Sequence, residues 1–136
     1  MKTGNLHRNW SAVQPQTYEK ERRIVNLDIR RDTQMVDDGE GGMVEQEGYS
    51  FLPVQIDPLI DYGHIKSQLI EAGFAQKDEF GLLMNALGDV LEAAREATTW
   101  EEFKAGISTE DIEAFRDFTE FRAMCAAAAH EVLLAY

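Results

Sequence analysis

The chain has 136 residues, a length typical of one domain or of one domain with an arm. Hydrophobic residues make up 44% and charged residues 28%, which are ordinary proportions for a globular protein. No apolar run approaches the roughly 18 residues that a membrane span needs, so we expect no membrane partner. The single cysteine excludes an internal disulfide.

The net charge of −12 is unevenly distributed along the chain. Residues 1–56 carry seven Lys/Arg against nine Asp/Glu, whereas residues 57–136 carry six against sixteen, a net of −10. An acidic half of this kind repels nucleic acid and anionic lipid, so we expect no nucleic-acid partner. This acidic half is typical of a solvated face that keeps the protein in solution. The alternative is a surface that mimics DNA or binds a basic partner.

Residues 1–21 show little periodicity, with Trp10, Pro15 and Tyr18 among polar residues. They predict an extended arm that lies across its own domain or across a neighbouring subunit. Because Trp10 has no local core to enter, it is a candidate anchor for an interface. The complete set of candidate interface residues is Trp10, Tyr18, Arg30, Arg31, Tyr49 and Phe51.

Residues 22–56 predict a long β-hairpin. In the first strand Val25, Leu27 and Ile29 alternate with polar residues, and the second strand alternates in the same way over residues 48–56. The glycine-rich segment 37–42 between them predicts the turn. Pro53 lacks an amide donor, so it places the second strand at a sheet edge or interrupts its ladder. Two strands alone are marginal in water and must pack on helices or join another chain's sheet.

Residues 57–136 change to helical periodicity. The first helix is expected to end near Gly73 and to carry Leu59, Ile60, Ile65, Leu69 and Ile70. Asp78 is the expected N-cap of a second helix, in which a buried stripe recurs at three- and four-residue spacing. That stripe consists of Phe80, Leu83, Met84, Leu87, Val90, Leu91 and Ala94. Gly81 and Gly88 interrupt this helix and mark close approach of another backbone.

Two further helices have clear start signals. Thr99 with Glu102 has the spacing of a capping box before a short helix, and Ser108 is a favourable N-cap for the last helix. The last helix has a small-residue run at 126–129 that lets another helix approach closely. Its apolar positions are Ile112, Phe115, Phe118, Phe121, Met124, Cys125, Val132 and Leu133.

No catalytic, cofactor-binding or metal-binding set stands out in the sequence. His7, His64 and His130 are isolated, and Cys125 reads as a small core residue beside Met124. His64 is expected to form a surface ion pair with Asp61, three residues earlier in the helical region. The turn glycines are not followed by the Lys-Ser/Thr of a phosphate loop. Arg30-Arg31-Asp32 is typical either of a charged, protected sheet edge or of an inter-subunit ion pair.

The stretch from GYSFLPVQI at 48–56 to the last helix, roughly residues 48–135, resembles the helical domains of phage tail-fibre-associated and related virion proteins. The pieces that carry the resemblance are Tyr62 ahead of Leu69-Ile70, Asp78-Glu79 before Leu82-Leu83, and the run from Phe118 to Ala126. The resemblance implies a phage or prophage virion protein that is made in the bacterial cytoplasm. It also implies a homo-oligomer or docking on other virion proteins, and it supplies no catalytic residues.

We therefore expect an α+β fold, with an extended arm at 1–21, a β-hairpin at 22–56 and a compact bundle of three to four helices at 57–136. The expected function is that of a non-enzymatic virion structural protein, whether fibre-associated or a head or tail component. A small acidic phage-encoded inhibitor or DNA mimic is the alternative. An enzyme would need a pocket in which distant His and carboxylate residues converge.

Overall fold

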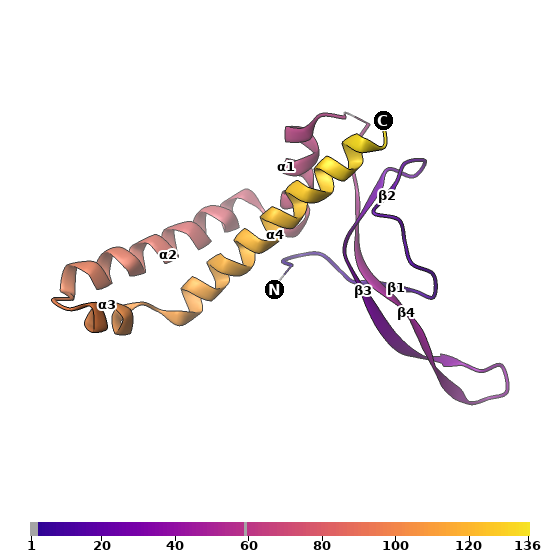
Figure 1. Ribbon diagram of the computed structural model, residues 1–136, viewed down its shortest axis with the longest axis horizontal. Helices are drawn as coiled ribbons and strands as arrows, with labels where there is room; N and C mark the ends of the chain where they lie inside the picture. Colours follow the sequence, from indigo (N-terminus) through magenta and orange to yellow (C-terminus); the bar gives the residue numbers. More distant parts are fainter. Residues whose placement is uncertain (1–2, 59) are drawn as a thin grey trace.

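The computed structural model describes residues 3–58 and 60–136. Four strands precede four helices, which confirms the expected α+β fold, and the strands form one antiparallel sheet of order β1-β4-β3-β2 (Figure 1). The elements in chain order are β1 (Asn9–Ser11), β2 (Tyr18–Glu19), β3 (Ile24–Asp37), β4 (Met43–Gln55), α1 (Tyr62–Gly73), α2 (Gln76–Glu96), α3 (Trp100–Gly106) and α4 (Thr109–Leu134).

The β3–β4 hairpin is a long ribbon whose far end projects away from the helices (Figure 1). The turn between its strands uses Gly39 and Gly41 at φ +81° and +83°, values that only glycine adopts without strain. The carboxylate of Asp38 accepts hydrogen bonds from the amides of Glu40 and Gly42 and closes the turn. The predicted glycine-rich turn is therefore confirmed.

The regular alternation predicted through Ile29 is wrong beyond Leu27. The strand register shifts between Leu27 and Arg30, because Asp28 adopts a left-handed φ of +48° and forms a bulge. Arg8 and Arg30 both donate to the Asp28 carboxylate. Burial opposes ionisation of Asp28, but the hydrogen bonds and charges of the two arginines outweigh it and lower the pKa of this carboxyl.

The N-terminal segment lies on its own domain. β1 pairs with β4 through the register Trp10↔Ser50, β2 pairs with β3 through Tyr18↔Val25, and the Asn5 amide donates to the Gly73 carbonyl at 2.7 Å. β1 reaches only as far as Phe51 on β4. Pro53 therefore lies past the end of β1, where a missing amide donor costs no ladder bond on that side.

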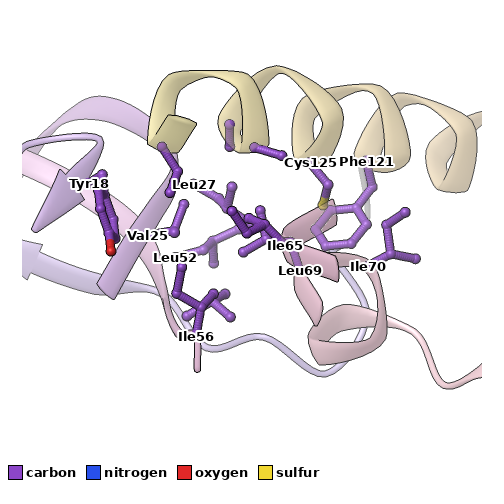
Figure 2. Close-up of a cluster of buried hydrophobic side chains, with 14 of the residues drawn as sticks. Tyr18, Val25, Leu27, Leu52, Ile56, Ile65, Leu69, Ile70, Phe121 and Cys125 are labelled. Atoms are coloured by element: carbon purple, nitrogen blue, oxygen red, sulfur yellow. The ribbon is translucent and has the colours of Figure 1, made fainter. Parts of the chain in front are cut away.

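The core lies where the sheet, α1 and the C-terminal half of α4 meet (Figure 2). The expectation that the hairpin packs on helices is thus confirmed. The ring of Phe121 lies directly against Gly73, where a Cβ atom would come within 2.6 Å of it. The largest side chains buried there are Phe121, Leu27, Leu52, Ile65, Leu69, Val25, Val132 and Cys125.

The helix starts follow side-chain caps at three of the four helices. Asp61 caps α1 by accepting from the His64 amide, so Ile60 precedes the helix, and Leu59 lies outside the described residues. Thr99 caps α3 and Ser108 caps α4, as the sequence predicts. The N-cap predicted at Asp78 is wrong, because α2 begins after Ala75. Asp78 instead lies in the first turn of α2, where its negative charge interacts favourably with the helix dipole.

Candidate interaction surface

Three elements extend away from the sheet and form what we call the helical arm: α2, α3 and the N-terminal half of α4 (Figure 1). Within the arm, α2 contacts α3 and α4. The buried apolar side chains of α2 are small, namely Ala86 and Ala93, each 5% exposed. Small residues let helices approach closely, but they remove little apolar surface from water. The arm therefore has a modest core of its own.

The large apolar residues of α2 lie on its surface. We call five of them the α2 stripe: Phe80, Leu83, Met84, Leu87 and Leu91, which are 65%, 45%, 46%, 45% and 60% exposed. The predicted buried stripe is therefore wrong for these residues. Helical spacing shows that the side chains share a face, but it does not show that the same chain supplies a layer to cover that face.

The α2 stripe continues across an open groove onto α4. Phe80 and Leu83 line one side of this groove, and Phe115 and Phe118 line the other, around a volume of about 320 Å³. Glu79, Thr119 and Arg122 complete its lining. An apolar floor with a few polar residues around it is the composition of a surface that binds another protein element.

Two glycines, Gly81 and Gly88, border the α2 stripe. A Cβ atom built on either would meet no heavy atom of a neighbouring element within 4 Å, so the predicted close approach of another backbone does not occur among the described residues. A glycine in an exposed helix interior costs about 1 kcal/mol relative to alanine. No packing contact in the described part of the chain offsets that cost.

An acidic pair joins the two long helices of the arm. Asp89 of α2 faces Asp111 of α4, next to the Ser108 cap. The hydrogen bond that the two carboxyls share when one is protonated raises the pKa of Asp89, and burial and the negative charges of Asp111 and Glu92 act in the same direction. The two carboxylates therefore repel each other less when one of them is protonated.

The predicted anchors Trp10 and Tyr18 contact their own chain. The half-buried Trp10 donates from Nε1 to the Asp32 carbonyl at 2.9 Å, and its ring covers Gly48. Tyr18 belongs to the core, and its hydroxyl lies 2.7 Å from that of Tyr136. Burial, with the hydrogen bond to Tyr136, raises the pKa of Tyr18 to about 12. These two aromatics fasten the N-terminal segment to the sheet and to the end of α4.

The other candidate residues lie along the middle of the sheet. Arg30 pairs with Asp28 at the bulge. Arg31 lies opposite Tyr49 in the ladder, and Phe51 follows two residues later on the same face of β4. Because the alternate β4 residues, from Gly48 to Val54, are buried on the inner face, these three side chains share the outer face of the sheet. The structure thus brings Arg31, Tyr49 and Phe51 together and separates them from Trp10 and Tyr18.

Two of the histidines, His64 and His130, have structural partners, and the cysteine is buried. The His64 ring pairs with Asp57 at 2.7 Å, whereas Asp61, the expected partner, caps the helix instead. The His130 ring stacks on Tyr62 with centroids 4.4 Å apart. Cys125 is fully buried, and burial raises the pKa of its thiol to about 12.

Residues 3–58 and 60–136 hold no group of three or more His, Cys, Asp or Glu side chains that could bind a metal ion. Within the same ranges, the helices are too short or too polar to cross a bilayer.

Comparison with protein-family models, curated proteins and solved structures finds no match to this chain. The geometry of the α2 stripe is therefore the main ground on which a function can be argued. The periodicity of α2 predicts an apolar face but not its exposure, because Gly81 and Gly88 beside it are equally typical of close helix packing.

Proposed function

We propose that the protein is a non-enzymatic structural component of a phage or prophage virion and that it acts through oligomerisation or by docking on other virion proteins. The observation that carries this proposal is the α2 stripe. Its five large apolar side chains lie side by side on one helix and are 45% to 65% exposed. Contiguous apolar surface of this kind marks interaction sites on proteins.

The shape of the chain supports the same proposal. The helical arm and the β3–β4 ribbon project in different directions from the core at their junction (Figure 1). The far end of the ribbon also exposes apolar side chains, with Met35, Met43 and Val44 between 46% and 59% exposed. Projecting elements that carry unburied apolar residues suit a subunit that contacts several neighbours.

The α2 stripe favours a structural role over the acidic inhibitor or DNA mimic. A surface that imitates DNA needs carboxylates where a partner expects phosphates. It gains nothing from a row of large apolar side chains on the helix that extends furthest from the core. The resemblance of residues 48–135 to virion proteins supports the virion as the assembly in which the arm finds its partner.

The proposal is tested on particles released by cells that encode the chain. We expect mass spectrometry of gradient-purified particles to detect the chain in a fixed ratio to the head or tail proteins. The chain should stay with the particles through a high-salt wash, because an apolar contact is not screened by salt. Detection in unfinished precursors alone would indicate an assembly chaperone and would contradict a structural role.

A further inference from the structure

Four residues of the α2 stripe have a spacing that reads the same in both directions along the helix. Phe80, Met84, Leu87 and Leu91 follow at intervals of four, three and four residues. This alternation is the seam of helices that pack side by side along their length. Its midpoint lies between residues 85 and 86, close to the middle of the 21-residue α2.

The surface that the stripe exposes is large enough for a dimer contact. A large apolar side chain has roughly 200 Å² of surface, and 45% to 65% of each stripe residue is exposed. The five side chains therefore leave about 500 Å² uncovered per copy. Two copies would bury at most about 1,000 Å² from these residues, and the groove beside Phe115 adds to this, which is at the lower end of the size of specific protein interfaces.

We infer that a second copy of this chain covers the α2 stripe, in a two-fold dimer with the two α2 helices antiparallel. This inference rests on the proposed function and names the partner of the arm. Because the spacing is symmetric, Phe80 lies opposite Leu91 of the partner subunit, and Met84 lies opposite Leu87 of the partner subunit. Each α2 keeps its own α4 beside it, so the two arms together form a four-helix arrangement.

The helix dipoles favour the antiparallel orientation. A parallel pair would align the two α2 dipoles, whereas an antiparallel pair sets the N-terminal end of each helix beside the C-terminal end of the other. The side-chain charges do not choose between the two orientations, because the first turn carries Asp78 and Glu79 and the last turn carries Glu96 beside Arg95.

The first experiment measures the mass of the full chain by light scattering over a range of concentrations. We expect a dimer, and we expect Leu87→Glu to weaken it at least about 100-fold, because both copies place the new charge in the apolar contact. Leu87 is 45% exposed in the single chain, so the variant should keep its fold, which circular dichroism checks. Val13→Glu is the matched control, since Val13 is 75% exposed in the N-terminal segment.

Disulfide cross-linking tests the orientation. A mixture of the Phe80→Cys and Leu91→Cys variants should cross-link between chains, and neither variant should cross-link with itself. In an antiparallel pair two copies of the same position lie about 16 Å apart along the helices, because eleven residues separate positions 80 and 91. The native Cys125 is fully buried and stays in both variants.

A chain that is monomeric at every concentration would overturn the dimer, and so would a dimer that Leu87→Glu leaves intact. Cross-linking of Phe80→Cys with itself would overturn the antiparallel arrangement. These results are separate from the particle experiment. A chain that is monomeric in solution but present in virions would keep the proposed function and lose this dimer.

Discussion

At the scale of single residues, the core depends on large side chains placed against glycine. The Phe121 ring contacts Gly73, which lets the end of α1 approach α4 closely. The Phe74 ring packs edge-on against Phe121 at 5.2 Å between centroids. Added volume at this point must displace an aromatic ring that has no free space around it, since Phe121 is 0% exposed.

We expect Gly73→Ala to lower the free energy of unfolding by about 1–3 kcal/mol, because the new methyl group would lie within 2.6 Å of the Phe121 ring. Gly81→Ala is the matched control. Its methyl group enters open space on a helix surface, so it should raise stability by about 1 kcal/mol. Urea unfolding of both variants measures the difference, and equal effects would contradict the packing account.

Tyr18 makes stability sensitive to alkaline pH. Its pKa is about 12 in the folded chain against an ordinary value of 10.0, so the folded state holds the phenolic proton more tightly than the unfolded state. The resulting stabilisation is complete below pH 10 and is lost as the pH rises from 10 towards 12. Tyr18→Phe keeps the buried ring and removes the titration.

We therefore expect the wild-type melting temperature to fall more steeply than that of Tyr18→Phe between pH 10 and 12. If the melting temperatures of the two proteins fall equally over this range, the pKa of Tyr18 is not raised by its burial and its hydrogen bond to Tyr136.

At the scale of elements, the helical arm and the core differ in how they are held together. The α1–α4 contact buries large side chains such as Leu69 and Phe121, whereas the buried apolar residues of α2 are the alanines Ala86 and Ala93. The arm also includes the Asp89–Asp111 carboxyl pair. We therefore expect the arm to open at lower free energy than the core, which hydrogen exchange resolves helix by helix.

The raised pKa of Asp89 predicts the sign of a pH dependence in the arm. The pKa of Asp89 is raised in the folded chain, so the folded state binds a proton more readily than the unfolded state. Stability of the α2–α4 contact should therefore rise as the pH falls through this raised pKa. Asp89→Asn imitates the protonated form. We expect it to slow hydrogen exchange in α2 at neutral pH and to reduce the response to acid.

Glu113→Gln is the control for Asp89→Asn, since it removes one charge from an exposed position of α4. If the two variants change exchange in α2 equally, general charge repulsion explains the effect rather than the carboxyl pair.

At the scale of the whole molecule, the N-terminal segment is part of the fold. β1 and β2 occupy the two edges of the sheet, and Tyr18 lies in the core. Deletion of residues 1–21 should therefore lower stability as well as remove a surface. We expect the truncated chain to unfold at lower urea concentration and to lose the near-ultraviolet signal of packed aromatics. Unchanged unfolding would indicate that the segment only rests on the sheet.

Much of the fold was predictable because its signals are local. Alternation around Val25 and Val54 indicated the strands, the glycines of the 37–42 turn indicated the hairpin, and the residues Thr99 and Ser108 indicated two helix starts. The bulge at Asp28 was not predictable, since it depends on Arg8, which is twenty residues distant. The interface candidates were chosen by residue type, and their partners come from distant segments: Tyr18 meets Tyr136, and Trp10 meets Gly48.

The β3–β4 hairpin, the helices and their apolar faces follow from the sequence, because hydrogen bonding and side-chain periodicity within a helix or strand are local. Which of these faces are covered follows only from how the elements pack on one another. The faces of α1 and the C-terminal half of α4 meet the sheet and are buried, whereas the equally regular face of α2 projects beyond it. The reason is physical: periodicity sets the direction of a side chain on its own element, but burial requires a second element in the same place.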